Sequence, residues 1–153
     1  MEHVDHPLVI YWDASAILSA LIEDKHSSEA QHWVAKEGIH FISTLSHSEV
    51  YAVLHRIQRE ERMTKEHIRV ALKTLGNGPW RLLNITPHWP IIRKLSSKWF
   101  LRGAILWHLA AIQTFRKEIP EILLLTYDIK LKVAAEGENI SLSGDSLNRG
   151  MRL

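Results

Sequence analysis

An apolar run that stops at an aspartate constrains this chain more than any other feature. Leu8 to Trp12 are apolar, with β-branched and aromatic members, and Asp13, Ala14 and Ser15 follow directly. Such a run is typical of a strand covered on both faces, as in parallel sheets. Apolar residues then recur with helical spacing from Ala16 to Leu21. The stretch therefore predicts a buried strand that leads into a helix beginning near Asp13.

A second apolar run has the same ending. Residues 122–125 are followed by Thr126, Tyr127 and Asp128, and another helical pattern comes next. Each aspartate could simply cap its helix, because a side-chain oxygen accepts an amide proton there and its charge suits the helix dipole. The other interpretation is a binding site. If the two strands are neighbours where strand order reverses, Asp13 and Asp128 face each other at the sheet edge where ligands bind.

Strand patterns alternate with helical patterns along the whole chain. Further strands are predicted at 39–43, 80–85 and 140–142, and the longest helix at about 46–61. This alternation predicts one α/β domain over residues 1–153, with a five-stranded, mostly parallel sheet. We expect its core to span about residues 8–142 and residues 144–153 to form a polar tail.

Composition limits the class of protein. With 46% hydrophobic and 24% charged residues, the chain is globular rather than disordered. Its formal charge of +2 gives only weak support for a polyanionic partner. The chain has no cysteine, which excludes disulfides and thiolate metal sites. No apolar run approaches the roughly 20 residues of a membrane span, so we expect a cytoplasmic protein without a membrane partner.

A third acid occupies a position similar to those of the two aspartates. Glu49 follows the predicted strand 39–43 and lies in the first turn of the next helix. Its charge there could simply favour the helix dipole. If instead Asp13, Glu49 and Asp128 meet at one edge of the sheet, their negative charges repel one another. A bound divalent cation that prefers oxygen ligands, such as Mg²⁺ or Mn²⁺, would stabilise this arrangement. Such an ion can activate water toward a phosphodiester.

Four segments of the chain resemble the motifs of PIN domains, in particular the VapC-like toxin ribonucleases of toxin–antitoxin modules. The segments are 11–16, 42–50, 102–110 and 124–131. The resemblance implies a three-layer fold with a central five-stranded sheet flanked by helices, in which the first and fourth strands are adjacent. It also implies a metal-dependent endoribonuclease that hydrolyses RNA through a metal-activated water. A homodimer and a small VapB-like antitoxin are the implied partners.

The resemblance also implies roles for individual residues. Asp13, Glu49 and Asp128 would be the catalytic carboxylates that hold Mg²⁺ or Mn²⁺, and Ser15 would help to hold a metal-bound water. One position departs from the family pattern, because Ile105 stands where the family has an aspartate. An isoleucine cannot bind a metal ion. The alternative function is therefore a PIN-fold module with weakened or absent catalysis that binds RNA or protein.

Two further sets of residues have open roles. His108 lies one turn beyond Ile105 on an apolar helix. It could support the site with its imidazole, although such a histidine is more often a hydrogen-bonded packing residue. Arg56, Arg59, Lys98 and Arg102 are candidates for contact with an RNA backbone. The alternative for these cations is a solvated helix face stabilised by i,i+4 pairs.

Overall fold

The computed structural model describes residues 7–142, and the predicted polar tail at 144–153 lies outside this range. A parallel sheet forms the centre, in the strand order β3-β2-β1-β4. Its strands are β1 (Val9–Trp12), β2 (Ile39–Ser43), β3 (Trp80–Leu83) and β4 (Ile122–Leu125). The helices are α1 (Ala14–Leu21), α2 (Ser27–Val34), α3 (Thr44–Arg59), α4 (Lys65–Asn77), α5 (Trp89–Lys98), α6 (Gly103–Phe115) and α7 (Ile129–Gly137). The predicted α/β class is confirmed.

Strand β1 is the centre of the sheet. Its first residue, Val9, pairs with Ile39 of β2 on one side and with Ile122 of β4 on the other. All four residues of β1 are buried, as the continuous apolar run predicts for a strand covered on both faces. The predicted adjacency of the first and fourth strands is confirmed, so the carboxyl ends of β1 and β4 meet at one edge.

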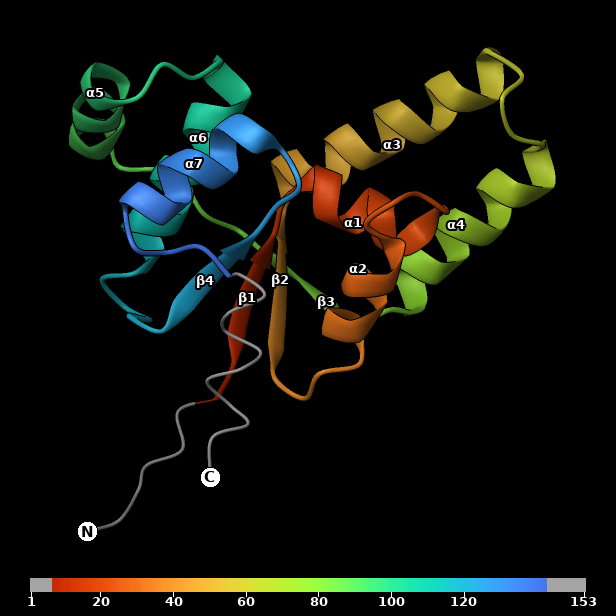
Figure 1. Cartoon of the computed structure of the whole chain (residues 1–153), viewed down its shortest axis with the longest axis horizontal. Helices are drawn as coiled ribbons and strands as arrows, with labels where there is room; N and C mark the ends of the chain where they lie inside the picture. The colour runs from red at the N-terminus through yellow and green to blue at the C-terminus, as the bar shows by residue number, and fades with distance from the viewer. Residues whose placement is uncertain (1–6, 143–153) are drawn as a thin grey trace, which may run out of the picture.

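Side chains of β1 alternate between two cores, one on each face of the sheet. Ile10 and Trp12 pack with apolar side chains of α1 to α4. Val9 and Tyr11 pack with apolar side chains of α5, α6 and α7. Figure 1 shows the resulting three layers, with α1 to α4 on one side of the sheet and α5 to α7 on the other. The period of two along a strand thus divides one apolar run between two helical layers.

The predicted fifth strand is wrong within the described residues. Residues 140–142 contact β4 through a single parallel bridge between Leu124 and Ser141. The Leu124 N–H donates to the Ile140 carbonyl over 2.7 Å, and the Leu142 N–H donates to the Leu124 carbonyl over 2.8 Å. The chain arrives there from α7 through Asn139, whose φ is 59°. After this sharp turn only Ser141 forms a β-bridge with β4, so the described sheet has four strands.

Two other boundaries differ from the sequence prediction. Strand β3 ends at Leu83 rather than at residue 85, and its position at the edge of the sheet gives it only one partner strand. Helix α3 spans Thr44–Arg59, earlier than the predicted 46–61. It begins there because Ser43 is its N-cap and accepts a hydrogen bond from the Ser46 N–H over 3.1 Å. Among residues 7–142, no helix has the length and apolar character that crossing a membrane requires.

Candidate functional site

Both predicted aspartates cap helices at the carboxyl ends of adjacent strands. Oδ1 of Asp13 accepts from the Ala16 N–H over 2.9 Å at the start of α1. Oδ1 of Asp128 accepts from the Leu131 N–H over 2.9 Å at the start of α7. The capping interpretation is therefore correct for both residues. It does not exclude the other interpretation, because the caps also bring two acids to the same edge of the sheet.

Asp13 is held by more than its cap. Asp13 is only 4% exposed, and its Oδ1 also accepts a hydrogen bond from Ser15 Oγ over 2.7 Å. Oδ2 accepts from Thr126 Oγ1 over 2.5 Å, and the Asp128 N–H donates to the same Thr126 oxygen over 3.0 Å. Thr126 therefore links the two aspartates. Sequence analysis missed this residue, although a hydroxyl two positions before the second aspartate was a visible signal.

Ser15 strengthens the link between the two strand ends. Besides donating to Asp13, its Oγ accepts from the Tyr127 N–H over 2.9 Å and lies 3.3 Å from Thr126 Oγ1. One serine thus joins the start of α1 to the turn that follows β4. The aspartates, Ser15 and Thr126 form what we call the acidic edge.

The charge of Asp13 has no basic partner among the described residues within ion-pair distance. Burial raises the pKa of Asp13, and hydrogen bonds from Thr126, Ser15 and Ala16, together with the charge of His108, offset this only in part. Burying a carboxylate is costly unless it is paired or binds a metal ion. The electrostatics at the acidic edge therefore favour an added cation.

Glu49 and His108 lie in a separate hydrogen-bonded chain. Nε2 of His108 is 2.6 Å from Glu49 Oε1, and its Nδ1 is 2.7 Å from the Tyr11 hydroxyl. That hydroxyl donates to Ser43 Oγ over 2.7 Å. Burial raises the pKa of Tyr11 far above its usual value, so the phenol keeps its proton. His108 is 3% exposed, and it is both a packing residue and a contact of a predicted site acid.

Ile105 lies beside Asp128. Both residues line a cavity of about 410 Å³ between the start of α6 and the start of α7, together with Arg102, Tyr127, Ile129 and Lys130. The position at which the family has an acid therefore faces the predicted site. In this chain it contributes a hydrocarbon wall, flanked by two basic residues that could attract an anion.

Comparison with known proteins supports the fold directly. No protein-family model and no curated protein matches the sequence. The structure of Mycobacterium tuberculosis VapC20, a Sarcin-Ricin loop cleaving toxin, has a TM-score of 0.55 and 14% identity over 82% of this chain and 94% of its own. PAE2754 from Pyrobaculum aerophilum has a TM-score of 0.59 and 15% identity over 92% of each chain. The chain has a VapC-like PIN fold. The resemblance read from the sequence is confirmed at the level of the fold.

The acidic side chains of this fold fit a single cation that keeps part of its water shell, rather than a cation held entirely by protein ligands. Among residues 7–142, no three His, Cys, Asp or Glu side chains cluster closely enough to hold a metal ion. Mg²⁺, however, keeps several waters and commonly binds through only one or two carboxylates and substrate phosphates. Asp13 and Asp128, joined through Thr126, supply oxygen donors of that kind. The donor chemistry therefore fits one cation.

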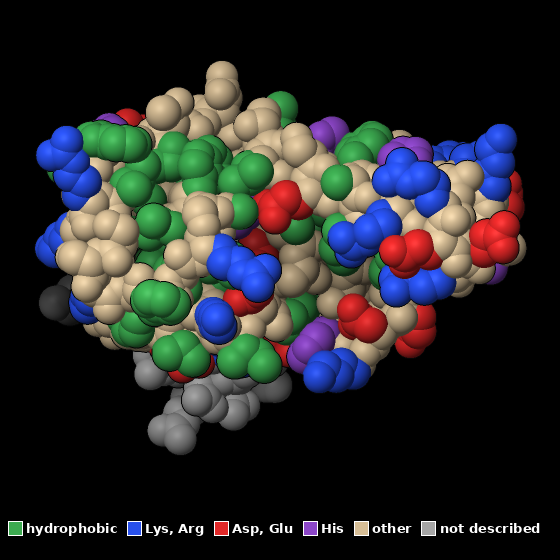
Figure 2. All heavy atoms as spheres, turned by 90° about the horizontal axis from the view of Figure 1, so that it is seen from above, with side chains coloured by type: hydrophobic (Ala, Val, Ile, Leu, Met, Phe, Trp, Pro, Cys, Tyr) green, Lys and Arg blue, Asp and Glu red, His purple; other side chains and the backbone are tan. Residues whose placement is uncertain are grey.

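The four basic residues predicted to contact RNA do not lie together in the structure. Arg102 lines the cavity beside Asp128. Lys98 instead pairs with Glu138 over 3.0 Å. Arg56 and Arg59 are exposed at the far end of α3. Figure 2 shows the face at the strand ends, with acidic side chains near its middle. A hydrophobic area lies on one side of them, and the region of α3 and α4, with many charged side chains, lies on the other. Arg102 is thus the candidate next to the acids.

Proposed function

We propose that this chain is a divalent-metal-dependent endoribonuclease that hydrolyses RNA phosphodiesters at the acidic edge. The observation that carries the proposal is Asp13, a buried carboxylate at the end of the central strand with no basic partner within residues 7–142. Three hydrogen bonds orient it, and one of them, from Thr126, ties it to Asp128. The Sarcin-Ricin loop cleaving activity named for VapC20, which shares the fold, supports this assignment.

In this proposal each residue has a distinct role. Asp13 and Asp128 would hold the ion, and Ser15, which donates to Asp13 and accepts from Tyr127, would orient a water molecule with its remaining lone pair. Mg²⁺ or Mn²⁺, when bound, would lower the pKa of a water and offset charge on the phosphate. Arg102 and Lys130 attract the phosphate from the neighbouring cavity. Glu49, oriented by His108, is the third acid and belongs to a different hydrogen-bonded chain from the other two.

The proposal extends to partners and location. The VapC-like fold supports a small VapB-like antitoxin as the protein partner and a second copy of the chain in a homodimer. We place this function in the cytoplasm, where RNA substrates and a reducing environment suit a chain without cysteine.

A second candidate function rests on Ile105. This residue lines the cavity beside Asp128 in place of an acid, and Glu49 is bound to His108. A site with these features could bind RNA or protein without cleaving it. Metal affinity separates the two functions, since a binding module has no need of the ion.

The test is cleavage of mixed structured RNAs by the purified chain with Mn²⁺ or Mg²⁺. We expect cleavage that is abolished by EDTA and by Asp13→Asn. Glu37→Gln is the matched control, because it makes the same carboxylate-to-amide change at an exposed residue. We also expect calorimetry to detect Mn²⁺ binding that Asp13→Asn removes. A folded chain that neither cleaves RNA nor binds Mn²⁺ would refute the nuclease and favour the binding module.

A further inference from the structure

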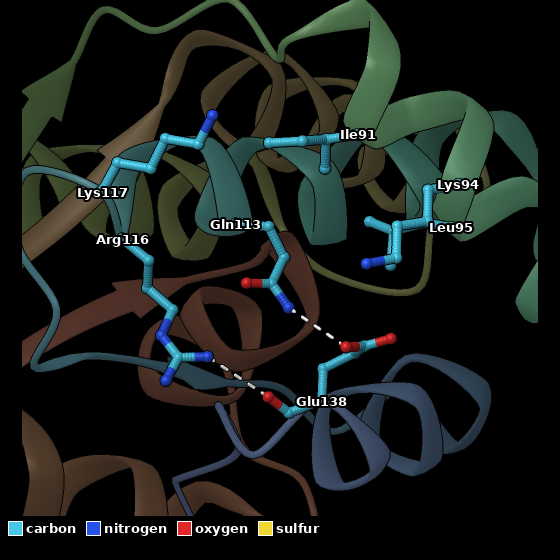
Figure 3. A pocket seen from close by; sticks show the side chains of 7 residues that line it. All are labelled: Ile91, Lys94, Leu95, Gln113, Arg116, Lys117 and Glu138. Atoms are coloured by element: carbon cyan, nitrogen blue, oxygen red, sulfur yellow. Dashed lines mark hydrogen bonds between the residues drawn. The ribbon is translucent and has the colours of Figure 1, made fainter.

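A second cavity, of about 450 Å³, lies between α5, the end of α6 and the end of α7. Polar side chains of Lys94, Gln113, Arg116, Lys117 and Glu138 line it. Figure 3 shows them around the open space, with Gln113 and Glu138 facing each other. The cavity is distinct from the acidic edge. Ile105 and Gln113 are eight residues apart on α6, which corresponds to about 12 Å along the helix.

The lining of this cavity carries an excess of positive charge. Lys94, Arg116 and Lys117 line it, and Glu138 is its one acid among the described residues. The charge of Glu138 is already engaged, because Lys98 Nζ lies 3.0 Å from its Oε1 and Trp99 Nε1 donates to the same oxygen over 2.9 Å. Gln113 Nε2 approaches the other oxygen at 3.4 Å. Glu138 therefore offsets only part of the charge of the three cations.

None of the three cations has an acidic partner within ion-pair distance among residues 7–142. Arg116 donates from Nη1 to the Glu138 carbonyl over 3.2 Å, which leaves other guanidinium N–H groups available. Partial burial raises the pKa of Glu138, but hydrogen bonds from Trp99 and Lys98 and the charges of Lys98 and Lys94 lower it by more. The net effect is a pKa below the usual value for a glutamate. Gathering like charges is unfavourable unless an anion joins them.

The other wall of the cavity is apolar. It is formed by Ile91 and Leu95 of α5, of which Leu95 is buried. A cavity of a few hundred Å³ with an apolar wall and a few convergent polar groups is typical of sites for small organic ligands. An arginine and two lysines match the oxygens and charge of a phosphate.

We propose that this cavity binds the phosphate group of a nucleotide, with the rest of the nucleotide against Ile91 and Leu95. The same phosphate chemistry belongs to a free nucleotide and to an RNA chain that extends across the molecule. The site needs no divalent metal, since its charge comes from Lys94, Arg116 and Lys117. It is therefore independent of the cation proposed for the acidic edge.

The indole N–H of Trp99 is a reporter for this cavity, because it donates to Glu138, which lines the cavity. Its NMR signal can be assigned with Trp99→Phe. The ¹⁵N-labelled chain is titrated in EDTA with adenosine monophosphate, inorganic phosphate, adenosine and a short single-stranded RNA. We expect saturable shifts with the first two ligands and none with adenosine. A matching shift with RNA would identify an RNA backbone as the source, and its absence would identify a free nucleotide.

Variants make the site specific. We expect Lys94→Gln and Lys117→Gln each to weaken the binding of adenosine monophosphate about twofold to fivefold, as loss of an exposed ion pair does. Lys73→Gln, an exposed lysine of α4, is the matched control and should leave binding unchanged. The proposal is overturned if adenosine monophosphate gives no saturable shift, or if Lys73→Gln weakens binding as much as the cavity variants. Because EDTA is present throughout, neither result bears on cleavage at the acidic edge.

Discussion

Asp13 and Asp128 occur in the same sequence pattern, but the fold gives their carboxylates different surroundings. Each follows an apolar strand and caps the next helix through Oδ1. Asp13 is buried and accepts additional bonds from Ser15 and Thr126, whereas Asp128 is only half-buried and lines an open cavity. The difference comes from position, because β1 is central in the sheet and β4 has only a single bridge on its outer side. A helix cap can therefore be a structural device, a site residue or both.

The largest effect that separates the two aspartates should be electrostatic. Burial raises the pKa of folded Asp13 above the ordinary value of 3.8. The folded state then holds this proton more tightly than the unfolded state, so the contribution of Asp13 to stability falls as pH rises above about 3.8. We expect Asp13→Asn, in EDTA, to be at least as stable as wild type at pH 7 and to lose less stability between acid and neutral pH. Urea unfolding across pH measures this, and equal pH slopes in both proteins would contradict it.

Removing the link between the aspartates should have the next largest effect. Thr126→Val keeps the shape of the side chain but leaves Oδ2 of buried Asp13 without its donor. We expect a loss of about 2 kcal/mol in the free energy of unfolding, since a charged group loses a buried hydrogen bond. Thr114→Val is the matched control, because Thr114 is also buried but bonds only neutral backbone groups. A smaller loss for Thr126→Val than for the control would show that Asp13 does not depend on this bond.

Adding an acid beside Asp128 tests the departure at Ile105. We expect Ile105→Asp to tighten Mn²⁺ binding about tenfold, because the new carboxylate would share the cavity with Asp128. Its own charge costs stability when no ion is present. Calorimetry with Ile105→Asn as the uncharged control separates ion binding from the change of shape. Equal affinities of the two variants would mean that this position does not reach the ion.

The smallest effect should come from the cap at Asp128. Asp128→Ala removes the acceptor of the Leu131 N–H and should lower the free energy of unfolding by about 1 kcal/mol. Asp128→Asn keeps that acceptor, so its effect should be within a few tenths of a kcal/mol. Thermal unfolding of the two variants gives the comparison. A large loss in the asparagine variant would show that the charge of Asp128, and not only its cap, stabilises the fold.

Sequence by itself determined the local features of this protein. The apolar runs determined buried strands, and each following aspartate determined where a helix begins, because both depend on neighbours only a few residues away. The alternation of these patterns was enough to predict the α/β class, whereas the adjacency of β1 and β4 was implied only by the resemblance to PIN domains. The pattern wrongly predicted a strand at residues 140–142, where an apolar pattern is present but only Ser141 forms a β-bridge with β4.

Only the tertiary structure decided which side chains meet. Thr126 contacts Asp13 across 113 positions of the chain, and His108 contacts Glu49 across 59. The cations at 94, 116 and 117 share a cavity because α5 and the end of α6 pack together. Such encounters depend on strand order, helix packing and rotamers, which no local pattern encodes. The roles of Asp13, Glu49 and Asp128 in catalysis stay a prediction, while their different surroundings are a property of the fold.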